Sequence, residues 1–272
     1  MLNSAFGYLR LMRAANCLIT FFSVIATSFF VTRSLAPSAL VWLGAAAASL
    51  ITAGGNALND YFDHEIDKIN KPDRPIPSGL VSRNAALVFS VILLGLGAGA
   101  SLFLNFPASA LAIMNACLLI VYARYSKAMS LAGNILVALL TSSVFVFAGL
   151  ILRVINFNVV VLAGSAFFVM LSREILKDIE DIEGDRRAGA TTLPIRAGVG
   201  RARAAATIFV IPAALLIFLP VIFRTTGWGY LVPIVPATLA LGFSFFQPPE
   251  KSQKTIKGAA VLVLLAFVAG SF

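Results

Sequence analysis

Two short segments carry nearly all of the acidic side chains in this 272-residue chain. Each contains three aspartates at positions i, i+3 and i+7: Asp60, Asp63 and Asp67 in the first, and Asp178, Asp181 and Asp185 in the second. At helical periodicity these positions lie within about 60° of one another on one face. Of the 12 acidic residues, only Glu250 lies outside segments 60–73 and 174–185. A general solubilising role would have spread them more evenly.

Such aspartate faces are typical of a divalent-metal site. Like charges at helical spacing repel, and each segment continues an apolar stretch, where an ionised carboxylate is costly. A cation removes both costs. Hard oxygen ligands favour Mg²⁺, Mn²⁺ or Ca²⁺, and Mg²⁺ typically takes one or two carboxylates plus phosphate oxygens and water. We expect two ions, held by Asn56, Asp60 and Asp63 on one side and by Asp178, Asp181 and Asp185 on the other. The alternative is a pair of solvated helix ends neutralised by neighbouring basic residues.

Basic side chains are interleaved with the aspartates. They are Lys68, Lys71 and Arg74 beside the first segment, and Arg173, Lys177, Arg186 and Arg187 beside the second. Cations placed there hold non-bridging phosphate oxygens and neutralise charge on a departing group. Two metal-binding faces with basic neighbours therefore predict a diphosphate site.

The elements that must position these residues are membrane-spanning helices. The chain is 59% hydrophobic and 12% charged, with a mean hydropathy of +0.92, which excludes an ordinary soluble enzyme, a disordered protein and a nucleic-acid-binding domain. Apolar runs of about 20 residues match the thickness of a bilayer. We predict an all-α integral membrane protein, a single domain over 1–272, with about nine spans at 14–32, 38–58, 85–103, 107–122, 131–152, 157–175, 204–223, 228–247 and 257–272.

The basic residues orient these spans. With the N-terminus inside, all but Arg33, Arg153 and Arg224 of the 21 Lys and Arg residues fall on the cytoplasmic side, as the positive-inside rule requires. Both aspartate segments fall on that side too. We therefore expect a multi-pass protein of the cell membrane with a cytoplasmic site. The net charge of +9 favours anionic membrane lipids as partners, not nucleic acid.

Other features predict packing or anchoring. Cys17 and Cys117 lie inside apolar runs and are expected to be core residues, not a disulfide or metal pair. Gly95, Gly97 and Gly99 are expected to allow close helix packing. We expect Lys251, Lys254 and Lys257 to anchor the last loop to lipid headgroups.

The motifs resemble those of the UbiA-type intramembrane prenyltransferases. Their NDxxDxxxD signature is matched by Asn59, Asp60, Asp63 and Asp67, with Asn56 fitting an overlapping NxxxDxxD form, and their DxxDxxxD signature by Asp178, Asp181 and Asp185. The flanking segments 71–79 and 189–194 are also similar. A Tyr/Lys motif of the family corresponds to Tyr122 and Lys127, with Tyr125 as the alternative tyrosine. Arg13 and Asn16 match a basic/amide pair at the start of the first span.

The resemblance implies a fold and an activity. Helices would surround a central cavity, with Mg²⁺ binding the diphosphate of an isoprenyl donor at its mouth and the isoprenyl tail in an apolar tunnel. It implies catalytic roles for the six aspartates, Tyr122 and Lys127. Substrate contacts would come from Arg13, Asn16, Asn56, Asn59, Lys68, Arg74, Lys127, Arg173 and Lys177. Arg13, Arg74, Lys127 or Arg173 would hold an acceptor phosphate.

Segments 55–79 and 173–195 are most similar to those of the archaeal digeranylgeranylglyceryl phosphate synthases. This likeness implies geranylgeranyl transfer from geranylgeranyl diphosphate to the free hydroxyl of geranylgeranylglyceryl phosphate, a lipid-like acceptor. An aromatic or chlorophyll-like acceptor is the alternative within the same chemistry. A multi-pass transporter is the alternative from another class, although the scarcity of polar groups on the outer face disfavours it.

Overall fold

A computed structural model describes residues 2–187 and 189–271, apart from the side chains of 2–4 and 126–128. These residues form helices and connecting loops, without a strand in the described ranges. The helices are α1 Leu2–Met12, α2 Ala14–Thr32, α3 Ala39–Asn70, α4 Arg83–Ser101, α5 Phe106–Met129, α6 Leu131–Ile151, α7 Phe157–Glu180, α8 Ile182–Arg187, α9 Leu193–Ala197, α10 Val199–Ile222, the 3₁₀ turn η1 Trp228–Tyr230, α11 Leu231–Ser244 and α12 Pro249–Ala269. The predicted all-α membrane architecture is confirmed.

Eight of the described helices are long and apolar enough to cross a bilayer: α2, α3, α4, α5, α6, α7, α10 and α12. The predicted span at 228–247 corresponds to η1 and α11, and α11 has only 14 residues. That length is below the ~20 residues of a full span, so the count of nine spans stays a prediction, as does the orientation of the N-terminus. Helix α1 was not predicted as a separate element. It is separated from α2 by Arg13, whose φ of 54° reverses the helical geometry.

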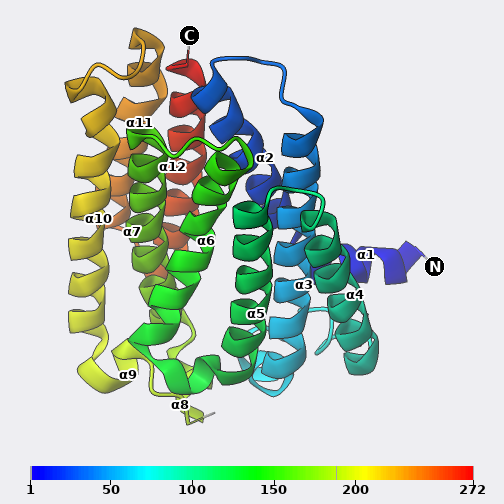
Figure 1. Cartoon of the computed structure of the whole chain (residues 1–272). Helices are drawn as coiled ribbons and strands as arrows, with labels where there is room; N and C mark the ends of the chain where they lie inside the picture. Colours follow the sequence, from blue (N-terminus) through cyan, green and yellow to red (C-terminus); the bar gives the residue numbers. More distant parts are fainter. Residues whose placement is uncertain (1, 188, 272) are drawn as a thin grey trace.

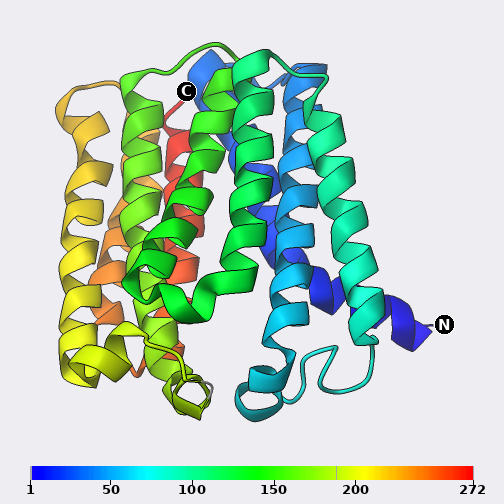
Figure 2. The same cartoon turned by 60° about the horizontal axis from the view of Figure 1, so that its bottom comes forward.

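The long helices stand side by side, and α8, α9 and the loop after α3 lie together at one end of them (Figures 1 and 2). The C-terminus lies at the opposite end (Figure 1). Buried apolar clusters fill the interfaces, one among α2, α3, α5 and α6 and two others where α7 packs with α6, α10, α11 and α12. Because α8 lies at the same end as the loop after α3, the two aspartate segments lie at one end of the protein.

Glycine allows α3 and α4 to pack closely. A Cβ atom on Gly97 would lie 2.9 Å from the Ala47 carbonyl oxygen and 2.9 Å from the Ile51 amide nitrogen, whereas the space at Gly95 and Gly99 is open. The expected packing role is therefore specific to Gly97 among these three glycines. Backbone atoms cannot move aside as a flexible side chain can.

Gly97→Ala should lower the free energy of unfolding by about 1–3 kcal/mol, because the added methyl overpacks the α3–α4 contact. Thermal unfolding of the purified protein in detergent measures the effect. Gly95→Ala is the matched control, since it adds the same methyl into open space on the same helix. Equal unfolding temperatures for the two variants would contradict this account of the interface.

Helix α3 is long enough to carry its aspartates beyond the apolar layer. Its 32 residues correspond to about 48 Å at 1.5 Å per residue, against about 30 Å of hydrocarbon. The last three turns therefore extend past the bilayer core, and Asp60, Asp63 and Asp67 lie on this continuous helix as predicted.

The second segment is less regular. Helix α7 ends at Glu180 and α8 starts at Ile182, so Asp178, Asp181 and Asp185 are not on one uninterrupted helix. This corrects the expectation of a single helical face. The Asp181 N–H still donates to the Lys177 carbonyl and the Asp185 N–H to the Asp181 carbonyl, at 2.9 and 3.0 Å. The i, i+4 pattern of backbone hydrogen bonds therefore continues across the bend between α7 and α8.

Candidate active site

A polar cavity of about 50 Å³ lies between the two aspartate segments. Its lining includes carboxylates from both: Asp63 and Asp67 from α3, and Asp178, Asp181 and Asp185 from the α7–α8 segment. Amide, hydroxyl and basic side chains complete it, among them Asn59, Asn70, Arg74, Asn134, Lys177 and Thr192. The structure therefore brings the two predicted faces together around one space.

On the α3 side, neighbouring side chains orient the carboxylates. The Asn59 amide donates to Asp63 at 2.7 Å, one helical turn away. Arg74, from the loop after α3, donates to Asp67. Both carboxylates therefore have fixed orientations within the cavity wall.

Asp60 occupies a different environment. It is 2% exposed and lines neither this cavity nor the larger one described below. Arg13 and Arg74 both donate to its Oδ1, at 2.7 and 3.1 Å. Burial opposes the charge on Arg13, but the Asp60 carboxylate outweighs it and raises the pKa of Arg13 above its ordinary value. Asp60 thus lies behind the cavity walls and holds one arginine of each: Arg74 of the polar cavity and Arg13 of the larger one.

On the α7–α8 side of the cavity, one aspartate bonds to a neutral amide and another to a lysine. The Asn134 amide of α6 donates to Asp178 at 2.8 Å. Lys71 forms an ion pair with Asp181 at 2.9 Å. Asp185 is 3% exposed and lies in the cavity wall. Asn134 of α6 and Lys71, which directly follows α3, thus share the positioning of the second segment.

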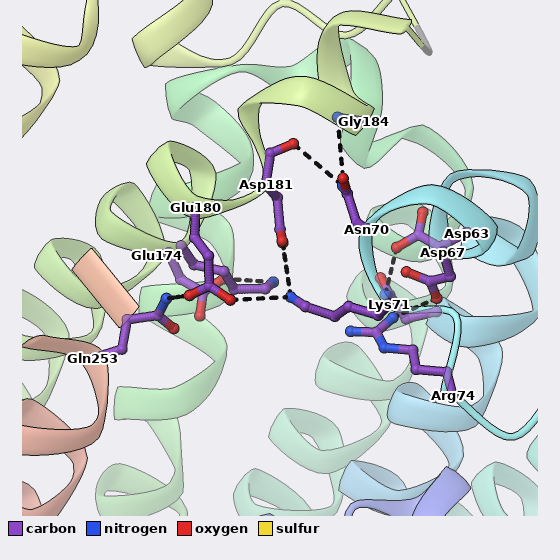
Figure 3. Close-up of polar contacts among 12 residues, drawn as sticks. Asp63, Asp67, Asn70, Lys71, Arg74, Glu174, Glu180, Asp181, Gly184 and Gln253 are labelled. Carbon is purple, nitrogen blue, oxygen red and sulfur yellow. Dashed lines mark hydrogen bonds and ion pairs between the residues drawn. The ribbon is translucent and has the colours of Figure 1, made fainter. Parts of the chain in front are cut away.

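Asn70 joins the two segments directly (Figure 3). Its amide nitrogen donates to the Asp181 carbonyl at 3.2 Å, and its amide oxygen accepts from the Gly184 N–H at 3.0 Å. A Cβ atom on Gly184 would lie 2.2 Å from the Asn70 oxygen, so glycine permits this approach. Figure 3 also shows Lys71 extending from the end of α3 to Asp181 and Glu180. These contacts hold the cavity walls at a fixed separation.

A larger, mainly apolar cavity of about 310 Å³ adjoins the polar one. Helices α2, α3, α5, α6, α7 and α12 supply most of its wall, and Ile51, Val144 and Phe147 are typical of the apolar part. Polar residues gather in one part of its lining: Arg13, Asn16, Asn56, Asn59, Tyr122, Arg173, Glu174, Lys177 and Lys257. Asn59, Tyr122 and Lys177 line both cavities. These three residues therefore mark the junction of a polar and an apolar compartment.

Most of the predicted site residues line one of these cavities, but some do not. Lys68 is exposed and forms an ion pair with Glu65 on the exposed surface of α3. Arg187 likewise pairs with Glu183 at the surface. Tyr122 lies at the junction, whereas Tyr125 is 56% exposed. The side chain of Lys127 lies outside the described residues.

Other predicted residues line the larger cavity and also bond to neighbouring groups. The Asn56 amide donates to the Met12 carbonyl at 2.9 Å, which ties α3 to the end of α1. Arg173 and Lys177 both pair with the buried Glu174, at 2.7 and 3.3 Å. Asn16 accepts a hydrogen bond from Lys257 of α12 at 2.8 Å.

The polar cavity fits a hard divalent cation. Its donor set is dominated by carboxylate oxygens, the ligands that Mg²⁺ prefers. The Thr192 hydroxyl lines the cavity, is buried, and has no hydrogen-bond partner among the described residues. Within the same residues, no three acidic, histidine or cysteine side chains converge into a ready-made metal cage. Mg²⁺ typically takes one or two carboxylates plus water and substrate phosphate, so an open arrangement suits it.

Sequence reasoning missed four residues of this site. Asn70, Asn134, Glu174 and Lys257 each bond to a predicted site residue or line a cavity. Asn134 is a polar side chain inside a long apolar helix, and this isolation was an available signal. Asn70 and Glu174 adjoin the two aspartate segments. Nothing in the local sequence distinguished Lys257 from its neighbours Lys251 and Lys254.

Comparisons with known proteins place this geometry in a family. The model of the UbiA prenyltransferase family matches residues 18–269. The chain belongs to the UbiA prenyltransferase family. Two similar relatives are the digeranylgeranylglyceryl phosphate synthases of Methanopyrus kandleri and Natronomonas pharaonis, each 39% identical. The first alignment covers 97% of this chain and 98% of the relative, and the second covers 97% and 96%.

Solved structures of UbiA proteins have the same fold. One, from work on digeranylgeranylglyceryl phosphate synthase in membranes, is 35% identical with a TM-score of 0.77, covering 98% of both chains. A UbiA homologue from Archaeoglobus fulgidus, bound to DMAPP and Mg²⁺, has a TM-score of 0.69 at 19% identity, covering 96% of this chain and 98% of that one. This UbiA chain is thus an integral membrane prenyltransferase, as the motifs predicted.

Proposed function

We propose that this enzyme transfers a geranylgeranyl group from geranylgeranyl diphosphate to the free hydroxyl of geranylgeranylglyceryl phosphate, forming the second ether bond of an archaeal membrane lipid. The observation that carries this proposal is the junction of a carboxylate-lined cavity with a larger, mainly apolar one. The lining of the first suits a metal-bound diphosphate, and that of the second suits an isoprenyl chain. The full-length similarity to relatives named digeranylgeranylglyceryl phosphate synthase supports the choice of acceptor.

We infer that two Mg²⁺ ions bind in the polar cavity. Asp63 and Asp67 would supply ligands from α3, and Asp178, Asp181 and Asp185 from the opposite wall. Asn56 and Asp60 were also predicted as ligands, and we propose that they instead position α1, Arg13 and Arg74. Bound Mg²⁺ supplies charge neutralisation to the diphosphate as its bond to the isoprenyl carbon breaks.

The chain's own residues account for the rest of the reaction. Lys177 lies where the diphosphate and the reacting carbon meet, and its ammonium stabilises negative charge on the leaving group. The Tyr122 ring stabilises positive charge developing on the allylic carbon. Apolar side chains such as Phe147 keep water from this carbon. The acceptor oxygen then forms the new C–O bond, and diphosphate and one proton are released.

We place this site at the cytoplasmic face of the cell membrane. The predicted inside segments, which include both aspartate segments, carry 18 of the 21 Lys and Arg residues, as expected for the cytoplasmic side. The predicted outer loops contain only Arg33, Arg153 and Arg224. Both substrates are amphipathic lipids, which enter from the inner leaflet with their phosphates at the membrane surface.

The purified enzyme should convert labelled geranylgeranyl diphosphate and geranylgeranylglyceryl phosphate into a diether lipid. Product identity is checked by mass spectrometry, with an aromatic quinone precursor and a chlorophyll-like alcohol as competing acceptors. A chelator should stop turnover, and added Mg²⁺ should restore it, because carboxylates alone repel the diphosphate. Turnover of only the aromatic or chlorophyll-like acceptor would refute the proposed acceptor while leaving prenyl transfer intact.

A further inference from the structure

Lys257 of α12 does not act as the surface anchor that its sequence context predicted. Its side chain lines the larger cavity, and its ammonium donates to the Asn16 oxygen at 2.8 Å. Its neighbour Lys254, less than one turn earlier, is 75% exposed and pairs with Glu250 at 2.8 Å. The same helix therefore directs one lysine to the surface and another into the cavity.

Lys257 belongs to a group of basic side chains that share this cavity: Arg13, Arg173, Lys177 and Lys257. Arg13 and Arg173 are close enough to Lys257 to interact with it electrostatically. Both repel its ammonium. Such a group of partly buried like charges is stabilised when an anion binds.

The carboxylates are unevenly shared within this group. Glu174 pairs with Arg173 and Lys177, and Asp60 pairs with Arg13 and Arg74. Aspartates of the polar cavity also attract Arg13 and Lys177. Among the polar contacts of the described residues, Lys257 bonds only to the neutral amide of Asn16, and its charged neighbours are Arg13 and Arg173. Lys257 is therefore the member of the group whose charge is not balanced by a carboxylate.

This positive region is separate from the aspartate cavity. Arg13, Arg173 and Lys257 line the larger cavity and are absent from the described lining of the polar one. Lys177 lines both and lies between them. Two regions of different charge therefore flank the junction. One is rich in carboxylates, and the other is rich in basic side chains, with Glu174 as the acidic residue in its described lining.

We propose that Lys257, with Arg173 and Arg13, binds the phosphomonoester of the lipid acceptor and so determines the acceptor class. This inference rests on the proposed function and extends it to the second substrate. A phosphomonoester carries a charge of about −1.5 to −2 and three acceptor oxygens, which would balance the Lys257 ammonium and its basic neighbours. Its glycerol hydroxyl then lies toward Lys177 and Tyr122, where the donor carbon is expected. Aromatic acceptors lack this phosphate.

Lys257→Gln tests the charge without removing the hydrogen bond, because a glutamine amide is also a donor to Asn16. We expect the KM for geranylgeranylglyceryl phosphate to rise about 10- to 100-fold, as for loss of a charge-assisted hydrogen bond. The donor KM and kcat should stay close to those of the unaltered enzyme. Lys254→Gln is the matched control, and Lys257→Arg should retain most of the acceptor affinity. An unchanged acceptor KM in Lys257→Gln, or an equal rise in Lys254→Gln, would overturn the inference.

A second acceptor separates phosphate recognition from a general effect on packing. With geranylgeranylglycerol, which lacks the phosphate, Lys257→Gln and the unaltered enzyme should have the same kcat/KM. A lower value for the variant would show that Lys257 supports the fold of the cavity and does not recognise the phosphate.

A binding measurement makes the inference independent of turnover. Geranylgeranylglyceryl phosphate should raise the thermal unfolding temperature of the detergent-solubilised protein without donor or Mg²⁺, and this rise should be smaller in Lys257→Gln. Stabilisation without turnover would refute the proposed function and support the anion site. Turnover with equal stabilisation of both proteins would support the proposed function and refute the anion site. The absence of stabilisation in both proteins would also refute the anion site.

Discussion

Asp63→Asn is expected to lower kcat/KM by about 10³-fold, the largest loss of activity predicted for a single substitution in this enzyme. Asp63 lines the polar cavity and is oriented by Asn59. Asparagine keeps the size of the side chain and still accepts that hydrogen bond, so the fold should be retained. The change removes the negative charge that attracts Mg²⁺. The Mg²⁺ concentration for half-maximal activity should therefore rise as well.

The matched control lies two residues further along α3. Glu65 is 68% exposed at its side chain and pairs with Lys68 on the outer face, so Glu65→Gln makes the same charge change away from the cavity. Its kcat/KM and Mg²⁺ dependence should equal those of the unaltered enzyme. A comparable loss in both variants would mean that the net charge of α3, not a metal site, governs activity.

Asp178→Asn extends the same test to the opposite wall, where Asn134 orients the carboxylate. If each wall holds an ion, this variant too should need more Mg²⁺. Near-normal activity in both Asp63→Asn and Asp178→Asn would show that the aspartate faces are not the metal site.

Hydropathy predicted the helices well because crossing a bilayer constrains segment length. Eight of the predicted spans match long apolar helices, and the boundaries agree closely where a turn residue ends the run, as at Asn105 before α5. The exception is 228–247, where η1 and the shorter α11 replace one full-length span. An apolar run sets the maximum length of a membrane-spanning helix. It does not determine whether a short turn divides that run into smaller helices.

The chemistry of the site was also predictable, because the aspartate spacing specifies a helix face. The contacts between distant segments were not. Asp60 pairs with Arg13, Asn70 with Gly184, and Lys257 with Asn16 across 47, 114 and 241 residues. These contacts depend on the rotation of each helix about its axis. Periodicity is informative about this rotation only where one face is clearly polar, and α12 gives no such signal near Lys257.

Asp60→Asn is expected to cause the largest loss of stability, about 3 kcal/mol in the free energy of unfolding. The carboxylate is 2% exposed and accepts from both Arg13 and Arg74. Removing one member of a buried ion network leaves the remaining charges uncompensated. Activity should fall too, because Arg74 also holds Asp67. Unfolding in detergent monitored by circular dichroism measures the stability, and Asp73→Asn, in the exposed loop after α3, is the control.

A double variant separates this positioning role from metal binding. If Asp60 acts by neutralising Arg13, then Asp60→Asn combined with Arg13→Gln should cost less stability than the sum of the two single changes, since one uncompensated charge has been removed. A metal ligand behaves differently. Asp60→Asn would then unfold at the temperature of the unaltered enzyme, require more Mg²⁺ as Asp63→Asn does, and show no coupling to Arg13. That result would return Asp60 to the metal site.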